Sequence, residues 1–368
     1  MRLGDYVSVK TGKLDANAAD ENGEYPFFTC SVNSLRINRY DYDCECVLVA
    51  GNGDLNVKYY DGKFNAYQRT YIIESNDKNV LLVPYLYRFM EKYVERLRSD
   101  AIGGVIKYIK LSNITDADIH ICTLDEQREK VDILDRVDAL ISKYQLKQTL
   151  MEEFVKSRFI EMFGDPMTNS MEWECVTLGD AVSVKPQNGL YKPQSDYVTN
   201  DSGTPILRID AFYEGRVNNF ADLKRLNCTD KEIQKYLLQE DDIVINRVNS
   251  LEYLGKCAHI TGLLEDTVYE SNMMRFHMKD EYNPIYTTHL LCSSYIKKQI
   301  MGCAKQAVNQ ASINQQDVQS FTILKPPIDL QNQFANFVTL TDKSKLSIQQ
   351  SIETLQTLKA KLMQDYFG

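Results

Sequence analysis

Residues 124–164, LDEQREKVDILDRVDALISKYQLKQTLMEEFVKSRFIEMFG, decide the fold, because their pattern returns in residues 328–368 at a constant offset of 204 residues. The second copy reads IDLQNQFANFVTLTDKSKLSIQQSIETLQTLKAKLMQDYFG. Six identities occur in 41 positions, among them Gln127 with Gln331 and Asp138 with Asp342. A register without gaps over this length predicts two helices of equal length.

The first copy has the features of one long helix. Thr123 and Glu126 form a capping-box pattern at its start. Apolar residues then recur at steps of three and four, which predicts a coiled-coil seam. In the first copy they are Leu134, Val137, Ile141, Tyr144, Met151, Val155 and Met162, and in the second Val338, Ile348, Ile352, Leu355, Leu362 and Tyr366. The alternative is an ordinary pair of core helices in a helical domain.

Three further apolar residues of the first helix lie beside this seam and widen it into a broader apolar stripe. They are Leu140, Phe154 and Phe159. They extend past the surface that one partner helix covers, so we expect this helix to pack against more than its twin.

Length and composition predict a globular protein of two or three domains. The chain has 368 residues, of which 43% are hydrophobic and 25% charged. Nine cysteines form no CxxC pair and four histidines form no HExxH motif, so no metal site is predicted. With no leader and no apolar run near 18 residues, we expect a cytoplasmic protein with reduced thiols and no membrane contact.

The net charge of −9 gives no support to a nucleic-acid partner. The excess of Lys and Arg over Asp and Glu is −2 for residues 1–123, −3 for 124–165, −4 for 166–325 and 0 for 326–368. A DNA-binding surface would therefore have to be a local basic patch that folding creates.

A second repeat lies outside the helices. Residues 3–10, LGDYVSVK, return as residues 178–185, LGDAVSVK, with seven of eight residues identical. The offset here is 175, so the second unit has 29 extra residues. The sequence thus predicts an α+β protein with two pseudo-symmetric mixed domains, 1–123 and 166–325, each followed by a long helix, 124–165 and 326–368.

Local patterns place the first strands and turns. Val47 to Ala50 is predicted as a buried strand, Gly51 to Asp54 as a turn with positive φ, and Asp61-Gly62 as a hairpin turn. A helix is expected to begin near Pro84, and its counterpart at Pro284.

Motifs for catalysis are missing. The stretch Asn283-Pro-Ile-Tyr286 is close to the loop with which amino-methyltransferases hold an adenine amine, but it lacks the second proline, and Pro84 begins a helix at the equivalent place. Gly51-Asn-Gly53 does not continue as GxGxxG. No nuclease cluster and no nucleophile-histidine pattern is present, so no catalytic residue is predicted.

Polar residues, including those with paired hydrogen-bonding groups such as Arg, Asn and Gln, and aromatic residues remain as candidates for binding DNA. Arg matches guanine, and Asn or Gln matches adenine, through paired hydrogen bonds. The alternative for each residue is a solvated strand end. The candidates are Arg36, Lys58, Tyr60, Lys63, Gln68, Arg69 and Lys107 in the first domain, and Arg208, Arg247, Asn249, Ser250, Asn272, Arg275 and Gln310, with its neighbour Asn309, in the second.

The chain resembles the DNA-specificity subunit of Type I restriction-modification enzymes over essentially its full length. The resemblance rests on the order and duplication of short motifs. They are the two Leu-Gly-Asp openings, Tyr25-Pro-Phe-Phe28, Val47-Leu-Val-Ala-Gly-Asn-Gly53, Gly62-Lys-Phe-Asn-Ala66, Phe163-Gly-Asp-Pro166 with Trp173, Pro205-Ile-Leu-Arg-Ile209, Asp241-Asp-Ile-Val-Ile245 and Leu324-Lys-Pro-Pro-Ile328. The family pattern is broken at Cys122-Thr123, where the second unit has Pro326-Pro327.

The resemblance implies two target-recognition domains that each read one half of a bipartite DNA site, separated by two antiparallel helices. It implies no catalysis in this chain, two methyltransferase partners with S-adenosylmethionine, and restriction or motor subunits with ATP. The apolar stripe would then contact a partner subunit. Two other functions stay open: a coiled-coil adaptor with two protein-binding domains, or a detached specificity part of a fused restriction-methylation enzyme.

Overall fold

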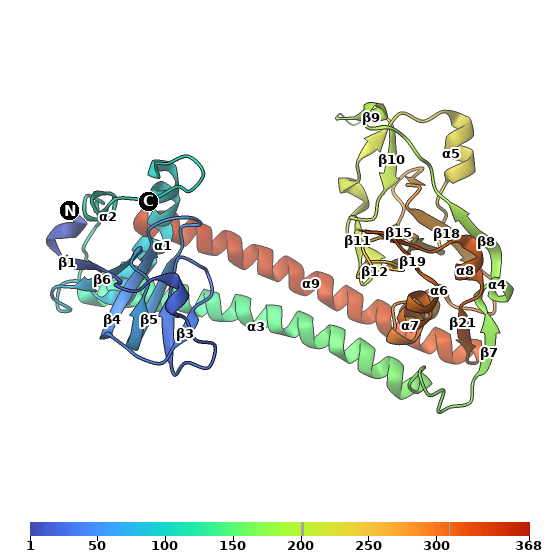
Figure 1. Cartoon of the computed structure of the whole chain (residues 1–368), viewed down its shortest axis with the longest axis horizontal. Helices are drawn as coiled ribbons and strands as arrows, with labels where there is room; N and C mark the ends of the chain where they lie inside the picture. Colours follow the sequence, from blue (N-terminus) through green and yellow to red (C-terminus); the bar gives the residue numbers. More distant parts are fainter. Residues whose placement is uncertain (200–201, 309) are drawn as a thin grey trace. The chain divides into compact units, whose positions relative to one another are not determined.

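The computed structural model describes residues 1–199, 202–308 and 310–368 (Figure 1). The chain forms two compact units: unit 1 contains Met1–Lys147 and Ser347–Gly368, and unit 2 contains Gln148–Leu346. Each unit combines one mixed domain with part of both long helices. The domain bounds expected from the sequence stay a prediction, because the compact units divide the helices instead of following those bounds.

The two long helices have equal lengths, as predicted. Helices α3 (Leu124–Phe163) and α9 (Ile328–Phe367) contain 40 residues each. The capping box at the start of α3 is confirmed: Thr123 N donates to Glu126 Oε2 at 2.9 Å, and Glu126 N donates to Thr123 Oγ1 at 3.3 Å. The different residues before the two helices, Thr123 and Pro327, therefore do not shift their starting register.

The helices run antiparallel within each unit. In unit 1, Lys359 Nζ lies 2.8 Å from Asp138 Oδ1, and Phe367, further along α9, packs on the core that contains the earlier α3 residue Val131. In unit 2, Lys345 pairs with Glu152 at 3.0 Å, and the earlier α9 residue Phe334 contacts Phe163 of α3. Within each unit the buried positions of α3 are three or four residues apart, at 127, 131, 134 and 137 in unit 1 and at 155, 159 and 163 in unit 2, whereas residues 138–154 are half-buried or exposed.

Unit 1 is built around a six-stranded sheet in the order β1-β6-β4-β5-β2-β3, in which only β2 and β5 pair in parallel. The strands are β1 (Val7–Thr11), β2 (Tyr25–Phe28), β3 (Leu35–Ile37), β4 (Tyr42–Ala50), β5 (Val57–Ala66) and β6 (Thr70–Ser75). Val47 and Val49 face a core shared with helix α1 (Val83–Asp100), whereas Cys46 and Leu48 face a second cluster. This alternation follows from the two-residue period of a strand.

One predicted turn in unit 1 is wrong. Asp61 and Gly62 do not reverse the chain, because β5 continues through them and pairs with Glu45 and Cys44 of β4. Gly62 has φ +128, so its positive φ is accommodated inside the strand. The predicted turn after β4 is confirmed, with Gly53 at φ +70, and α1 has proline in its first turn as expected.

Unit 2 repeats this plan with additional strands. Its six-stranded sheet has the order β11-β12-β16-β14-β18-β8, and a separate four-stranded sheet has the order β17-β10-β13-β9. The first sheet contains β8 (Val182–Asn188), β11 (Phe212–Tyr213), β12 (Gly215–Val217), β14 (Asp242–Asn246), β16 (Cys257–His259) and β18 (Met273–Met278). The second contains β9 (Tyr197–Val198), β10 (Thr204–Leu207), β13 (Arg225–Leu226) and β17 (Val268–Tyr269).

Smaller elements complete unit 2. Strands β15 (Val248–Asn249), β20 (Ala311–Ser312) and β19 (Lys305–Gln306) form a small sheet, and β21 (Thr322–Lys325) pairs with β7 (Glu174–Thr177). The helices are α4 (Leu178–Ala181), α5 (Asp230–Tyr236), α6 (Pro284–Leu291), α7 (Ser294–Cys303) and α8 (Gln315–Gln319); unit 1 has α2 (Leu111–Thr115) at the place of α8. Helix α6 begins at Pro284, as predicted, and Asn283 Oδ1 accepts hydrogen bonds from the N–H groups of Ile285 and Tyr286.

Candidate nucleic-acid interface

Three chain segments of unit 1 meet at the end of β4, and we call residues 51–54, 67–69 and 102–109 the unit 1 tip. Gly51 N donates to Arg69 O at 2.8 Å, and Gly53 N donates to Lys107 O at 2.9 Å. The side chains of Gln68, Arg69 and Lys107 are exposed. These two hydrogen bonds join the turn at residues 51–54 to the backbone carbonyls of Arg69 and Lys107. Two exposed cations therefore lie next to the same turn.

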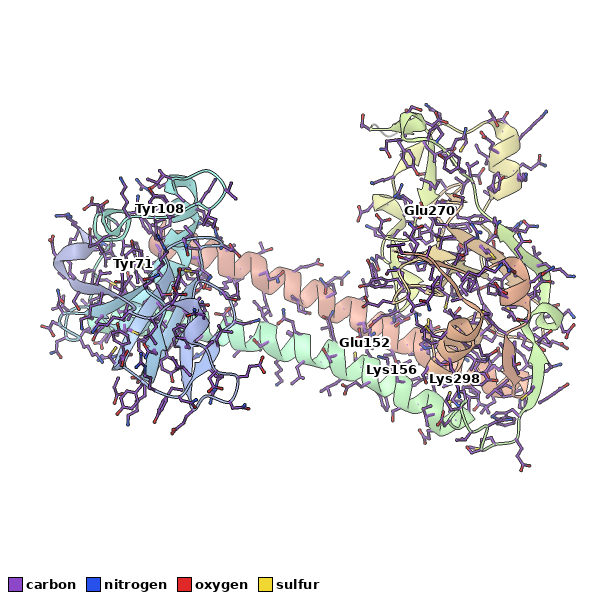
Figure 2. The ribbon with its side chains drawn as sticks, viewed as in Figure 1. Tyr71, Tyr108, Glu152, Lys156, Glu270 and Lys298 are labelled. Carbon is purple, nitrogen blue, oxygen red and sulfur yellow. The ribbon has the colours of Figure 1, made fainter. Side chains whose placement is uncertain are left out.

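Two tyrosines and a glycine fix the geometry of this tip. Tyr71 Oη donates to Ile109 O at 3.2 Å, and Tyr108 bridges to Asn52 through the backbone. Figure 2 labels both tyrosines. A Cβ atom at Gly51 would lie 2.5 Å from Arg69 O, so only glycine allows the chain segments to approach this closely.

Unit 2 forms the equivalent surface from residues 246–250, 271–272, 305–308 and 310–313, which we call the unit 2 tip. Arg247 N donates to Asn272 O at 2.8 Å, and Ile313 N donates to Arg247 O at 3.0 Å. The second bond is equivalent to a hydrogen bond in unit 1, in which Ile109 N donates to Gly51 O. The two donors, Ile109 and Ile313, are 204 residues apart in the sequence. Asn249 pairs with Ala311 across the small sheet. The sequence candidates Arg247, Asn249, Ser250, Asn272 and Gln310 are therefore brought together, whereas Asn309 lies outside the described residues.

Arg247 is a half-buried cation of this surface. Its Nη1 donates to Ser271 O at 3.3 Å, and among the described residues its buried Nε has no hydrogen-bond partner. The side chain borders a hollow of about 340 Å³ whose other walls are all amide side chains, Asn188, Asn314, Gln315 and Gln316. Sequence reasoning missed these four residues, although the run Asn314-Gln315-Gln316 is a visible cluster of adenine-reading types.

The other candidates of unit 1 lie on β3 and β5 and are partly engaged inside the chain. Arg36 donates to the carbonyls of Gly23 and Glu24 at 2.9 and 2.7 Å. Lys58 Nζ donates to Ser31 O at 2.8 Å, and burial lowers its pKa. Lys63 lies 4.7 Å from the Tyr40 ring centre, and Tyr60 packs on Phe28 and Phe64. Hydrogen bonding and packing at these positions favour a role in shaping the sheet edge.

Arg208 directly follows β10 of the four-stranded sheet of unit 2. Its Nη1 donates to Tyr197 Oη at 3.0 Å, and Nε is 3.9 Å from Glu270 Oε2. Burial raises the pKa of Glu270, which Figure 2 labels. Arg208 borders a separate hollow of about 240 Å³ with Asn218, Asn219 and Lys224, so the structure does not bring it into the unit 2 tip.

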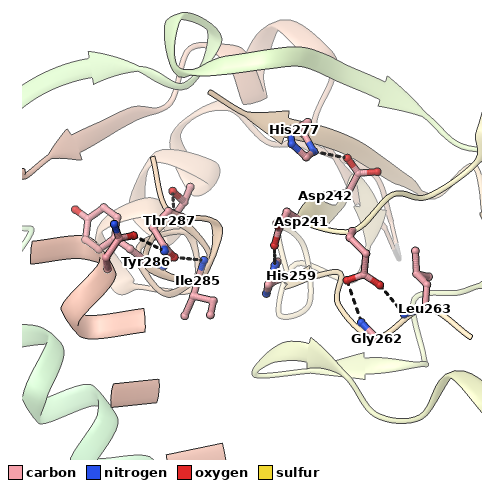
Figure 3. Close-up of polar contacts among 12 residues, drawn as sticks. Asp241, Asp242, His259, Gly262, Leu263, His277, Ile285, Tyr286 and Thr287 are labelled. Atoms are coloured by element: carbon pink, nitrogen blue, oxygen red, sulfur yellow. Dashed lines mark hydrogen bonds and ion pairs between the residues drawn. The ribbon is translucent and has the colours of Figure 1, made fainter. Parts of the chain in front are cut away.

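Arg275 lies on β18 and pairs with a buried acid. Its Nη1 donates to both carboxylate oxygens of Asp242, at 3.2 and 3.1 Å, and Asp242 is fully buried. His277 Nδ1 lies 3.1 Å from the same carboxylate (Figure 3). This pairing favours a structural role for Arg275 in the sheet, and its role in DNA binding stays a prediction.

Of the three residues expected to widen the apolar stripe of α3, two are exposed and one is buried. Leu140 and Phe154 are 44% and 57% exposed, although the Phe154 ring also contacts Phe337 in unit 2. Phe159 is 6% exposed and packs between Phe163, Tyr286 and Phe334. The Phe159 ring therefore belongs to the core of unit 2, and its contact with a partner subunit stays a prediction.

In the part of the chain that the structure describes, no group of three or more His, Cys, Asp and Glu residues could hold a metal ion. Over the same residues, no helix is both long and apolar enough to cross a membrane.

Comparison with known proteins places the chain in a family. Residues 1–152 and 170–358 match the model of the Type I restriction modification DNA specificity domain, and the chain belongs to this family. It is 37% identical over 153 residues to the Type I restriction enzyme EcoDI specificity subunit of Escherichia coli, which covers 42% of this chain and 33% of that protein. It is 30% identical over 201 residues to the putative type I restriction enzyme MjaX specificity subunit of Methanocaldococcus jannaschii, covering 53% and 45%.

The chain thus spans 33% and 45% of the length of these two relatives. A solved structure with the same fold is the S subunit of a Type-I restriction-modification system from M. genitalium, with a TM-score of 0.63 and 15% identity over 100% of this chain and 95% of that chain. Its likeness agrees with the predicted α+β class and with two repeated mixed domains and long helices.

Proposed function

We propose that the chain is the DNA-reading subunit of a Type I restriction-modification enzyme, in which unit 1 reads one half of a bipartite site and unit 2 the other. The main support is the duplicated tip. Equivalent backbone hydrogen bonds assemble three segments around Gly51 and around Arg247, and each tip presents polar side chains to solvent. Two equivalent surfaces on one chain suit a target with two separated halves.

The residues of the two tips differ in the bases they suit. Arg247 offers a guanidinium fork to the O6 and N7 acceptors of guanine, and Asn249, Asn272 and Gln310 suit adenine. In unit 1 the equivalent of Arg247 is Gly51, so Gln68, Arg69 and Lys107 would contact the other half-site. Local cations of this kind bind phosphates even on a chain with net charge −9.

The reactions would belong to partner subunits. Two methyltransferase subunits would bring S-adenosylmethionine and modify adenine, and restriction or motor subunits would use ATP; the chain itself would bind neither cofactor and catalyse no step. The exposed side chains of Leu140 and Phe154 offer an apolar contact for such a subunit. All nine cysteines are free, which suits the cytoplasm, where the complex would meet DNA.

Two rival functions make different predictions. A coiled-coil adaptor with two protein-binding domains would have no salt-dependent affinity for DNA. A detached specificity part of a fused restriction-methylation enzyme would bind a bipartite site but would direct a single fused partner. The tips expose polar side chains such as Gln68, Arg69 and Lys107, but also apolar ones, namely Val105 and Ile106 in unit 1 and Val308 in unit 2. The choice between DNA and a protein ligand therefore rests on the binding test.

The test combines methylation mapping with binding. The chain is expressed with its methyltransferase partner in a methylation-deficient host, and genomic adenine methylation is sequenced. We expect one bipartite motif, and a binding constant that falls steeply with salt because phosphate contacts release counterions. A double variant with Arg69→Ala and Arg247→Ala should change the motif or abolish methylation, while Arg128→Ala, an exposed arginine on α3, should leave it unchanged. Absence of any motif together with salt-independent binding would support the adaptor.

A further inference from the structure

Two cysteines of unit 2 meet although they are 35 residues apart in sequence. Cys257 lies on β16 and is fully buried, and Cys292 follows the last residue of α6 and is exposed. Their Sγ atoms are 3.2 Å apart, and Cys257 Sγ is also 3.7 Å from Thr288 O. Both are free thiols.

The surrounding fold holds this pair together. Cys257 is anchored in the sheet by the pairing of β16 with β14, and Thr288 and Cys292 lie one helical turn apart at the end of α6. A Cβ atom at Gly215 would lie 3.1 Å from Thr288 Cγ2 and 3.9 Å from Cys292 Sγ, so β12 closes over the same place. The two sulfur atoms therefore have little freedom to separate.

The two thiols differ in acidity and in access. The hydrogen bond from Cys257 lowers the pKa of Cys292, whereas the same bond and burial raise the pKa of Cys257. Cys292 also borders a pocket of about 450 Å³ that is lined by Lys156, Arg216 and Lys345 and by the acidic residues Glu152 and Glu214. The Glu214 carboxylate acts to raise the pKa of Cys292, but the hydrogen bond from Cys257 outweighs it and favours the thiolate, which is the reactive form of cysteine. An oxidant in the pocket would thus meet Cys292 first.

We propose that Cys257 and Cys292 are a modification site at which a hydroperoxide converts two thiols into one intramolecular disulfide. The Cys292 thiolate attacks one oxygen of hydrogen peroxide, the O–O bond breaks, and the leaving hydroxide takes up the proton that the Cys292 thiol released, which gives a sulfenic acid and one water. The Cys257 sulfur then attacks the sulfenic sulfur, forming the S–S bond, and the leaving hydroxide takes the remaining thiol proton as a second water. The peroxide supplies the oxidising equivalents, and the two thiols lose two hydrogen atoms.

The distance favours a disulfide over a shared metal ion. Each sulfur bound to zinc lies about 2.3 Å from the metal in tetrahedral geometry, which separates two sulfur ligands by more than 3.2 Å. A disulfide bond is about 2.05 Å long, so the sulfur atoms need to approach by only about 1 Å.

The bond would join the sheet of unit 2 to the helices beneath it. Helix α6 carries Tyr286, which contacts Phe159 and Phe163 of α3, and His289, which contacts Phe334 of α9. A covalent link from β16 to the end of α6 therefore restrains the sheet against this aromatic core. The oxidised protein is expected to melt at a higher temperature than the reduced protein, because the unfolded chain is also restrained.

The experiment treats the reduced full-length chain with hydrogen peroxide, alkylates the remaining thiols and maps peptides by mass spectrometry. We expect a Cys257–Cys292 cross-linked peptide that lacks two hydrogen atoms, disappears on reduction and accompanies a rise in Tm of unit 2 followed by Trp173 fluorescence. Cys292→Ser, at an exposed position, should abolish the cross-link and the rise in Tm without impairing folding.

Control variants separate this site from general oxidation. Cys44→Ser changes one of two cysteines on β4 and Cys303→Ser changes the last residue of α7, and both should leave the cross-link intact. Cross-linking of Cys257 or Cys292 to any other cysteine would overturn the proposal, as would oxidation of Cys292 to sulfinic acid with no disulfide.

Discussion

Gln127 and Gln331 make the same three hydrogen bonds at equivalent places of the two units. Gln127 Oε1 accepts from Leu82 N at 2.9 Å, and its Nε2 donates to Val80 O and Cys122 O. Gln331 Oε1 accepts from Asn283 N at 2.8 Å, and its Nε2 donates to Glu281 O and Pro326 O. Both side chains are fully buried. Each glutamine thus fastens the start of a domain helix to the start of a long helix.

The first prediction concerns these glutamines. Gln331→Ala should lower the free energy of unfolding of unit 2 by about 2 to 4 kcal/mol, because it leaves buried N–H and C=O groups without partners. Urea unfolding followed by Trp173 fluorescence reports on this unit. Gln333→Ala, at an exposed position of the same helix, should change it by less than about 0.5 kcal/mol. Equal effects of the two changes would contradict the proposed fastening.

The second prediction separates base reading from phosphate binding at Arg247. Arg247→Ala should weaken specific binding by about 1 to 3 kcal/mol and relax one base in one half-site, because a guanidinium fork reads guanine. Arg247→Lys keeps the charge but loses the guanidinium fork. It should relax the same base, but it should change the dependence of binding on salt concentration less than Arg247→Ala does. Methylation sequencing and salt titration measure the two effects. A uniform loss over all sequences would indicate a phosphate contact instead.

The third prediction distinguishes Arg275 from Arg247. Arg275→Ala should reduce the free energy of unfolding by about 3 to 5 kcal/mol, because the buried Asp242 carboxyl group would lose the arginine that donates to both of its oxygens. The methylated sequence should stay unchanged in the protein that still folds. Thermal melting and methylation sequencing of the same variant test both parts, and a changed motif at full stability would show that Arg275 reads a base.

The fourth prediction is acid sensitivity at the helix pair of unit 1. Burial acts to raise the pKa of Asp138, but hydrogen bonds from Lys359 and Arg88 outweigh it and lower the pKa. A lowered folded-state pKa contributes stability above the unfolded value of about 3.9, and this contribution is lost as pH falls through the folded pKa. Asp138→Asn should therefore be less stable at pH 7 and show a flatter loss of stability towards acid. Asp132→Asn, exposed on the same helix, should behave as wild type in urea titrations at pH 7 and at acid pH.

The fifth prediction rests on the proposed function and concerns the gap between half-sites. Four residues inserted after Lys147 and after Ser351 add about 6 Å to each helix at roughly 1.5 Å per residue. Since DNA advances about 3.4 Å per base pair, the unread gap should grow by one or two base pairs while both half-sites keep their bases. The inserted turn also rotates each domain, so affinity is expected to fall. Altered half-site bases with an unchanged gap in methylation sequencing would refute the spacer role.

Much of the candidate interface could be predicted because turn chemistry is local. Gly51-Asn-Gly-Asp54 requires a turn wherever it occurs, and Arg69 and Lys107 then lie near it through backbone hydrogen bonds. The amides Asn188, Gln315 and Gln316 were missed, because they come from distant segments and only the folded chain places them around Arg247.

The sequence by itself determined the long helices, their equal lengths, the capping box at Thr123 and the duplication of the mixed domain, because periodicity, caps and repeats depend on neighbours within a few residues. Tertiary structure alone decided which members of a residue type are exposed. Phe154 and Phe159 belong to the same apolar stripe, yet only Phe159 meets Tyr286 and Phe334. Arg247 and Arg275 are the same residue type, but Arg275 faces Asp242 across the sheet, 33 residues away. Such partners are set by strand pairing and packing, and no spacing along the chain encodes them.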